Sequence, residues 1–215
     1  EENIKNTWFT DREIGVQLSG GVDSSLILSI LKEKINIEKI STFSVIFDDT
    51  NSKYYLPRSE EKFIDEVVEK YNLNSHKFLF NSQEIKEALP KSIWQYEAPI
   101  PGASTSLYYL LAQKIKKHVD VVVTGEAVDD IFNGYFNDWI FTEDSNSHFK
   151  FFVPENIVRE LFQLTEQNHP MKNIKCILEN ESVKRMTPIQ KTTIISLKGG
   201  LQALLARHCL LYTSD

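Results

Sequence analysis

Short apolar runs alternate with amphipathic stretches over roughly the first two thirds of the chain. Runs rich in β-branched and aromatic residues predict buried strands, and they lie at residues 13–19, 40–47, 76–80 and 119–125. Stretches with apolar residues at helical spacing predict helices, and they lie at residues 22–34, 59–72, 82–97 and 104–118. This alternation predicts an α/β fold, in which a right-handed parallel sheet is sandwiched by helices.

The pattern also makes finer predictions within these elements. In the second predicted helix, Phe63, Val67 and Tyr71 recur at helical spacing and are expected to face the core. Pro90 is expected to interrupt the third helix, because proline lacks the amide hydrogen that continues a helix. The last predicted strand is almost all valine, which is typical of a central strand buried on both faces.

The pattern changes after residue 153, and the remainder reads as helical with no convincing strand. We therefore expect an α/β core at residues 1–153 and a helical extension at residues 154–208. The chain opens without a methionine or an apolar targeting segment, so its native start is expected upstream. Residues 209–215, CLLYTSD, look like a translated sequencing adapter and are expected to be a non-native tail.

Composition narrows the class of function. A chain of 215 residues, 41% of them hydrophobic, can bury a full-sized core. Its net charge of −6 disfavours binding to nucleic acid phosphates, and a small-molecule substrate is expected instead. The two cysteines and five histidines share no metal-ligand spacing, and no apolar run is long enough to cross a bilayer. A reducing, cytoplasmic location without membrane partners is expected.

The segment SGGVDSS lies where the first predicted strand ends and the first helix begins, the position at which open α/β sheets bind ligands. Glycines let the backbone turn tightly beside a phosphate, and the amides that begin a helix attract anions. The alternative is an ordinary strand-to-helix link with a capping aspartate. The residues expected to hold phosphates are Ser19, Gly20, Gly21, Asp23, Ser24 and Ser25.

Asp23 indicates which ligand this loop binds. A carboxylate beside phosphates is repulsive unless a divalent cation intervenes, so we interpret Asp23 as a ligand of Mg²⁺. The Walker A pattern is absent, and no lysine of that kind is placed to draw a terminal phosphate. Cleavage between the α and β phosphates of a bound nucleotide is the more natural outcome.

The motif SGGxDS is the signature of the PP-loop ATP pyrophosphatases, and the chain resembles that superfamily. The resemblance implies a Rossmann-like fold of the adenine nucleotide alpha hydrolase type and a loop that holds the pyrophosphate of ATP. Members include the synthetases of asparagine, argininosuccinate, GMP and NAD, together with tRNA-modifying enzymes.

A second motif, TGEAVDDIFNGY, follows the valine-rich run, so both motifs are expected to face one crevice. Asp129 is expected to share the magnesium ion with Asp23, and Gly125 to contribute to nucleotide binding. Glu126 is expected to act as the general base for an incoming amine, and Tyr135 to hydrogen-bond a phosphate. The alternative is that these acids merely favour the first turn of a helix.

This second segment resembles the SGEGxDExFGGY stretch of asparagine synthetases, in which the base, the magnesium aspartate and the tyrosine align with Glu126, Asp129 and Tyr135. The resemblance implies that a carboxylate, aspartate or a similar one, is adenylated and then attacked by ammonia. In that family the ammonia comes from glutamine through an N-terminal glutaminase domain, which is expected here either upstream of the given residues or as a separate partner. The piece is expected to bind nucleotide without turning over alone, and a homodimer is compatible with it.

The sequence departs from the asparagine synthetase pattern at four positions, which are Gly102, Ala127, Asp130 and Asn133. Gly102 and Ala127 keep open one alternative, an amidotransferase or cyclase of this type that acts on another acceptor. Two further alternatives come from the superfamily. They are a tRNA-modifying PP-loop enzyme, which should have a basic face and is disfavoured by the acidic charge, and a non-catalytic adenine-nucleotide binding module.

Overall fold

A computed structural model describes residues 12–34, 40–47, 59–97, 104–132, 134 and 176–198, together with residues 160, 163, 165, 205 and 209. The chain divides into two units, one of residues 1–126 with 207–215 and one of residues 127–206. Each unit is described by itself. The boundary expected between residues 153 and 154 lies outside the described residues, as does all of the expected tail except Cys209.

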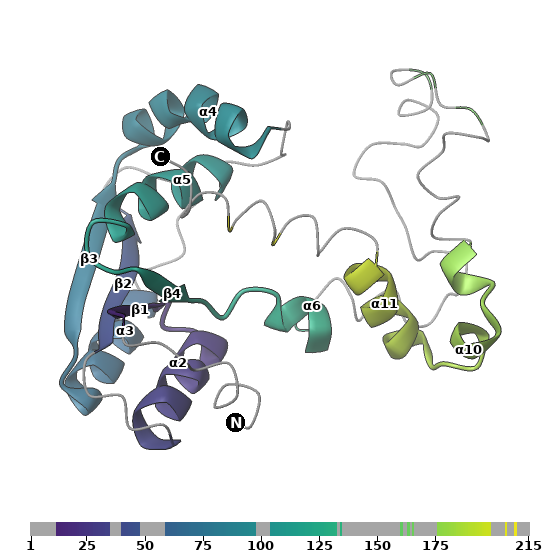
Figure 1. The fold of residues 1–215 in the computed structure, drawn as a ribbon, viewed down its shortest axis with the longest axis horizontal. Coiled ribbons are helices and arrows are strands. Elements are labelled where there is room, and N and C mark those ends of the chain that lie inside the picture. The colour runs from purple at the N-terminus through teal and green to yellow at the C-terminus, as the bar shows by residue number, and fades with distance from the viewer. Residues whose placement is uncertain are drawn as a thin grey trace. The chain divides into compact units, whose positions relative to one another are not determined.

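The first unit contains a parallel sheet of four strands (Figure 1). All four predicted strands are present, as β1 (Ile14–Gln17), β2 (Ile40–Phe47), β3 (Asn74–Phe80) and β4 (Val121–Val123). Their order is β3-β2-β1-β4, with β1 paired to β2 on one side and to β4 on the other. The chain therefore changes direction across the sheet at β1 and β4, which makes their carboxyl ends the switch point.

Helices cover both faces of this sheet (Figure 1), as the sequence predicts for the fold class. On one face, α2 and α3 pack against β1 and β2. On the other face α5 packs against β2, and α4 lies against α5. The bounds are α2 (Val22–Ser29), continued as a π-helical turn at Ile30–Lys34, α3 (Ser59–Tyr71), α4 (Ser82–Tyr96) and α5 (Ser104–Ile115).

Each face has its own apolar core. Beneath α2 and α3 the fully buried side chains are Val16, Leu18, Leu28, Leu31, Ile40 and Ile64. Beneath α5 the core consists of Phe43, Leu111 and Ile115, with valines and Phe78 packed around them. The two cores hold β1 and β2 between helices, so the loops that leave these strands start from fixed positions.

Details of burial differ from the sequence prediction at two elements. In α3, Ile64 is buried, whereas Phe63 is half exposed. Val67 and Tyr71 do pack against the core, together with Val68, so the buried face shares two predicted positions and is centred nearer Ile64 than Phe63. The three residues of β4 are only half-buried, and among the described strands β4 pairs with β1 alone, so the burial on both faces that its valines suggest is not seen there.

Pro90 does not interrupt its helix. Helix α4 runs unbroken from residue 82 to residue 96 with Pro90 inside it. A capping box between Asn81 and Glu84 satisfies the amides at its start. Packing of Tyr96 against α5 anchors its end. These interactions offset the backbone hydrogen bond that the proline removes.

The second unit is helical where it is described. Its elements are α6 (Val128–Phe132), α10 (Glu181–Lys184) and α11 (Pro188–Ser196). A capping box between Thr187 and Gln190 starts α11. The hydroxyl of Thr193 donates to the carbonyl oxygen of Ile131 at 3.3 Å, which ties α11 to α6. Within the described ranges, no helix has both the length and the apolar character needed to cross a bilayer.

Replacing Gly15 by alanine should destabilise the first unit by about 1–3 kcal/mol, because overpacking forces a close-packed core apart. A Cβ atom at Gly15 would meet the ring of Phe43 and lie 2.9 Å from Cγ2 of Val119. Urea unfolding would measure this. Gly21→Ala is the control, since its Cβ would meet only the Ser19 hydroxyl at 3.3 Å and should cost less than about 1 kcal/mol. Equal losses in both variants would contradict the packing argument.

His76 should make stability depend on pH. Its ring stacks on Phe43, with centroids 5.2 Å apart, and lies 4.3 Å from the ring of His118. Burial, and then the charge of His118, lower the pKa of His76 below its ordinary 6.5. As the pH falls through 6.5 the unfolded chain takes up this proton more readily than the folded one, so the free energy of unfolding falls.

The measurement is the free energy of unfolding between about pH 7.5 and 5.5, compared between the wild type and His76→Phe. The variant keeps a stacked ring without a titrating group, so its curve should be flatter. His118→Phe, the matched control, should flatten the curve only in part, because it removes the neighbouring charge and leaves the burial. An unchanged slope in His76→Phe would refute this account.

Candidate functional site

The first motif begins at the carboxyl end of β1. The amide and the carbonyl oxygen of Leu18, the residue before the motif, both form hydrogen bonds to β2. The amide of Leu18 donates to the carbonyl oxygen of Phe43 at 2.9 Å. The buried hydroxyl of Ser44 donates to the carbonyl oxygen of Leu18 at 2.7 Å. The loop that follows therefore starts from a point fixed by the sheet and by a side-chain bond.

Two serines hold the loop in shape. The hydroxyl of Ser24 accepts a hydrogen bond from the amide of Ser19 at 3.2 Å and donates to the carbonyl oxygen of Gly21 at 3.3 Å. The Ser19 and Ser24 hydroxyls lie 3.1 Å apart, and the amide of Gly21 donates to the Ser19 hydroxyl at 3.3 Å. Ser24 is buried, so its hydroxyl bonds to the loop itself, while Ser25 is half-buried in the first turn of α2.

Different features of the structure explain why glycine occurs at positions 20 and 21 of the motif. Gly20 has a φ of +81°, which favours glycine, and a Cβ there would lie 2.7 Å from the carbonyl oxygen of Glu60 at the start of α3. Gly21 is the N-cap of α2 and supplies no side-chain cap. No capping side chain competes for the first amides of this helix, and its positive dipole end attracts an anion.

The second motif lies beside the first. A Cβ at Gly125 would be 3.0 Å from the amide nitrogen of Ser24 and 3.3 Å from Cβ of Asp23. The backbone after β4 thus passes directly against the first turn of α2, and any side chain at Gly125 would crowd the Ser24 amide. The structure brings together Ser19, Gly20, Gly21, Asp23, Ser24, Ser25 and Gly125, and Glu126 follows next in the chain, half-buried.

Asp129 belongs to the second unit, in the first turn of α6. Its carbonyl oxygen accepts from the amide of Gly134 at 2.9 Å, and its carboxylate oxygen occupies the space that a Cβ at Gly134 would need. The sharing of one magnesium ion by Asp23 and Asp129 stays a prediction, and Tyr135 lies outside the described residues. Among the described residues no three His, Cys, Asp or Glu side chains gather to hold a metal.

Ala127 adopts a backbone conformation that alanine rarely takes. Its φ is +75°, in the left-handed region, and its side chain is buried. This is one of the positions at which the asparagine synthetase pattern commonly has glycine. The turn after Glu126 therefore keeps the glycine-like shape at a cost of about 1–2 kcal/mol in backbone energy.

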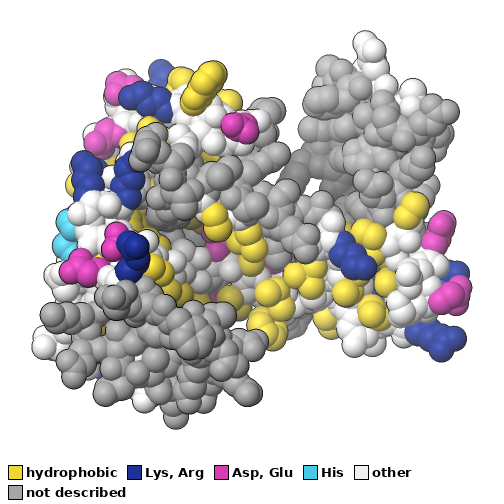
Figure 2. Space-filling view, in the orientation of Figure 1, with side chains coloured by type: hydrophobic (Ala, Val, Ile, Leu, Met, Phe, Trp, Pro, Cys, Tyr) yellow, Lys and Arg dark blue, Asp and Glu magenta, His cyan; other side chains and the backbone are white. Residues whose placement is uncertain are grey.

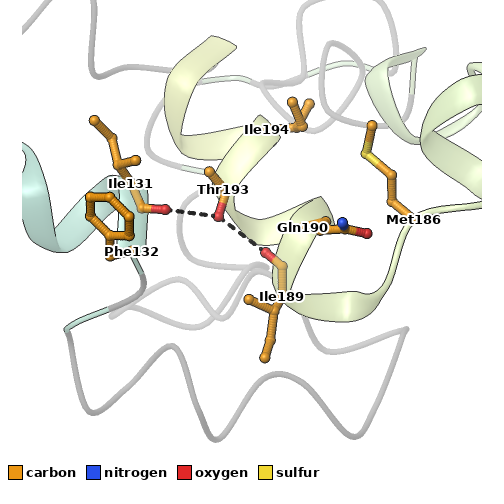
Figure 3. A pocket seen from close by; sticks show the side chains of 7 residues that line it. All are labelled: Ile131, Phe132, Met186, Ile189, Gln190, Thr193 and Ile194. Carbon is orange, nitrogen blue, oxygen red and sulfur yellow. Dashed lines mark hydrogen bonds between the residues drawn. The ribbon is translucent and has the colours of Figure 1, made fainter. Parts of the chain in front are cut away.

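Sequence reasoning assigned nothing to an apolar pocket of about 330 Å³ in the second unit (Figure 3). It lies between α6 and α11, and its lining residues are Ile131, Phe132, Met186, Ile189, Gln190, Thr193 and Ile194. Figure 3 shows Ile131 and Phe132 on α6 across from the residues of α11. The adjacent apolar residues Ile131 and Phe132 within the second motif were the signal available in the sequence.

Comparison with known proteins identifies relatives of this chain. A family model described as asparagine synthase matches residues 1–196. Glutamine-hydrolyzing asparagine synthetase 1 of Bacillus subtilis is 32% identical over 126 residues, which are 59% of this chain and 19% of that protein. Asparagine synthetase of Homo sapiens is 30% identical over 141 residues, 61% of this chain and 24% of that protein.

These relatives are much longer than the aligned part, so the chain spans about a fifth to a quarter of their length. Among solved structures, the U34-tRNA thiolase NcsA of Methanococcus maripaludis is 14% identical with a TM-score of 0.39, covering 98% of this chain and 76% of that one. A likeness that distant supports no statement about function. The family match covers most of the chain, and we conclude that this chain belongs to the asparagine synthase family.

Proposed function

We propose that the chain is the nucleotide-binding part of an ATP-dependent amide-forming ligase, which adenylates a carboxylate and releases AMP and pyrophosphate after ammonia attacks. The observation that carries the proposal is the approach of Gly125 to the first turn of α2. It brings the two motifs to one place at the switch point of the sheet, where open α/β sheets bind ligands. Membership in the asparagine synthase family supports the same reaction class.

The first loop suits a polyphosphate through its backbone. Gly20 and Gly21 add no side chains to the loop, and the first amides of α2 have no side-chain cap. The Ser19 and Ser24 hydroxyls keep these amides in place through bonds within the loop. Backbone amides held in this way bind an anion without the reorganisation that a flexible lysine would need.

Asp23 and Asp129 are the residues that would hold Mg²⁺, and carboxylate oxygens are the donors that this ion prefers. When bound, the ion supplies charge neutralisation for the phosphates. Asp23 fits this role because it is half-buried in the uncapped first turn of α2. Without a cation its carboxylate would repel the phosphates that the neighbouring amides attract.

Glu126 is proposed as the general base. It comes directly after Gly125, whose backbone lies against the phosphate loop, so its carboxylate belongs to the same edge of the sheet. Ammonia that attacks an acyl adenylate must lose a proton, and a nearby carboxylate can accept it. Tyr135 is proposed to hydrogen-bond a phosphate or the intermediate.

The acceptor and the ammonia source follow from the family rather than from the described residues. Aspartate is the proposed acceptor, and ammonia derived from glutamine by a glutaminase domain is the proposed nitrogen donor. Ala127 favours one alternative, an enzyme of this type with another acceptor, because this residue departs from the family pattern directly after the proposed base. A profile of carboxylate substrates would separate the two.

Replacing Asp23 by asparagine should have opposite effects with and without magnesium. With Mg²⁺ present, ATP should bind about tenfold more weakly, because the ion loses a charged ligand. In EDTA, ATP should bind the variant as tightly as the wild type or more tightly, because a like charge beside the phosphates is gone. Isothermal titration calorimetry on the 215-residue chain would measure both.

The matched control for this experiment is Asp120→Asn. Asp120 lies just before β4, at the other end of the strand from the motif, and pairs with Arg12 at 3.5 Å. Its replacement should leave both affinities unchanged. If Asp23→Asn weakened ATP binding equally with and without magnesium, Asp23 would be a structural residue of the loop and the metal assignment would be wrong.

Replacing Glu126 by glutamine should separate the two halves of the reaction. In the longer protein of which this chain is proposed to be a part, carboxylate-dependent exchange of pyrophosphate into ATP should change less than about threefold. Amide formation with ammonia should fall roughly 10²–10⁴-fold. Hydroxylamine, which is unprotonated at neutral pH, should restore part of it. Glu69→Gln, on the exposed side of α3, is the control.

Two results would contradict this assignment. Loss of exchange together with amide synthesis in Glu126→Gln would mean that Glu126 is needed for adenylation itself. Absence of exchange in the wild-type protein with every carboxylate tried, although ATP binds, would replace the ligase proposal by a non-catalytic nucleotide-binding module.

A further inference from the structure

Helix α4 carries an apolar stripe on its outer side. Its inner side is buried through Ala88, Ser92 and Tyr96. On the outer side four apolar residues are neighbours at helical spacing and are all exposed, and they are Leu89, Pro90, Ile93 and Trp94. Trp94 is 84% exposed, more than any other large apolar residue described in this chain. An exposed tryptophan among other apolar side chains is typical of a contact surface.

The stripe has opposite charges at its two ends. Lys86 lies one turn before Leu89 and Pro90, and Glu97 lies one turn after Ile93 and Trp94. Both are exposed, and neither forms an ion pair with another described residue. Hydrophobic side chains on the outside of α4 accordingly have basic and acidic side chains beside them (Figure 2). The helix ends at Glu97, its C-cap, so the charged positions delimit the stripe.

The stripe is complementary to itself when its sequence is read in reverse. Positions equally distant from the midpoint between Lys91 and Ser92 form the pairs Lys86 with Glu97, Leu89 with Trp94, and Pro90 with Ile93. When two identical helices pack antiparallel about a two-fold axis through this midpoint, each residue of a pair meets the other member of that pair on the second copy. Every apolar residue then meets an apolar one, and each lysine meets a glutamate.

We propose that α4 is a self-association surface, which pairs with α4 of a second copy of this chain about a two-fold axis. Trp94 of each copy covers Leu89 of the other, and Lys86 of each copy pairs with Glu97 of the other. A second copy fits better than an unrelated partner because the stripe matches itself in both charge and apolarity. The stripe is narrow, so the dimer is expected to be weak.

Sedimentation equilibrium of the 215-residue chain over a range of concentrations tests this, with charge reversals as probes. Lys86→Glu alone places two glutamates together at both ends of the interface, and Glu97→Lys alone places two lysines together. Each should raise the dimer dissociation constant roughly tenfold at low salt. An equimolar mixture of the two variants should form a heterodimer with both ion pairs restored, and the double variant should dimerise like the wild type.

Trp94→Ser should raise the dissociation constant about thirtyfold or more, as expected for a central tryptophan of an interface. Circular dichroism spectra of all variants should match that of the wild type, and the mixing experiment does not depend on any single variant folding perfectly. A wild type that stays monomeric at every concentration would overturn the proposal and assign the stripe to a different partner. A dimer whose dissociation constant does not change with the charge reversals or with Trp94→Ser would overturn the proposal too.

Discussion

The close approach of Gly125 to the first turn of α2 is the contact on which the candidate site depends. It exists because β4 pairs with β1 in parallel, which brings the loops after both strands to one edge of the sheet. Side chains would prevent it, since a Cβ at Gly125 would lie 3.0 Å from the Ser24 amide, and one at Gly20 would meet the backbone of α3. Three backbone segments therefore converge where the motifs have glycine.

This convergence would let the loop bind phosphates, as proposed, without a lysine. The first amides of α2 have no side-chain cap, and the Ser19 and Ser24 hydroxyls form hydrogen bonds within the loop that hold its shape. A site built from fixed dipoles has no mobile cation to follow a departing terminal phosphate, so it suits a reaction in which pyrophosphate leaves as one unit. In the proposed site, the carboxylate of Asp23 would require a metal ion for the phosphates to bind beside it.

Much of this arrangement could be predicted from the sequence, and the exceptions have physical causes. The four strands, the two motifs and their common edge follow from periodicity and from the rules for parallel sheets. Helix periodicity alone could not choose between Phe63 and Ile64, since Val67 is a helical neighbour of both, four residues after one and three after the other. The valines of β4 suggested a central strand, but strand order depends on tertiary pairing. Pro90 stays within α4 because caps and packing, which lie outside the local pattern, outweigh its lost bond.

The two surfaces proposed for this chain lie on separate parts of the first unit. The uncapped start of α2 packs on the face of the sheet that carries α3, whereas α4 lies on α5, which covers the opposite face. Two copies paired through their α4 helices would therefore leave the nucleotide loop of each copy uncovered by that contact. Both copies could then bind ATP independently, since the phosphate loop is held by bonds within β1, β2 and α2 and needs nothing from α4.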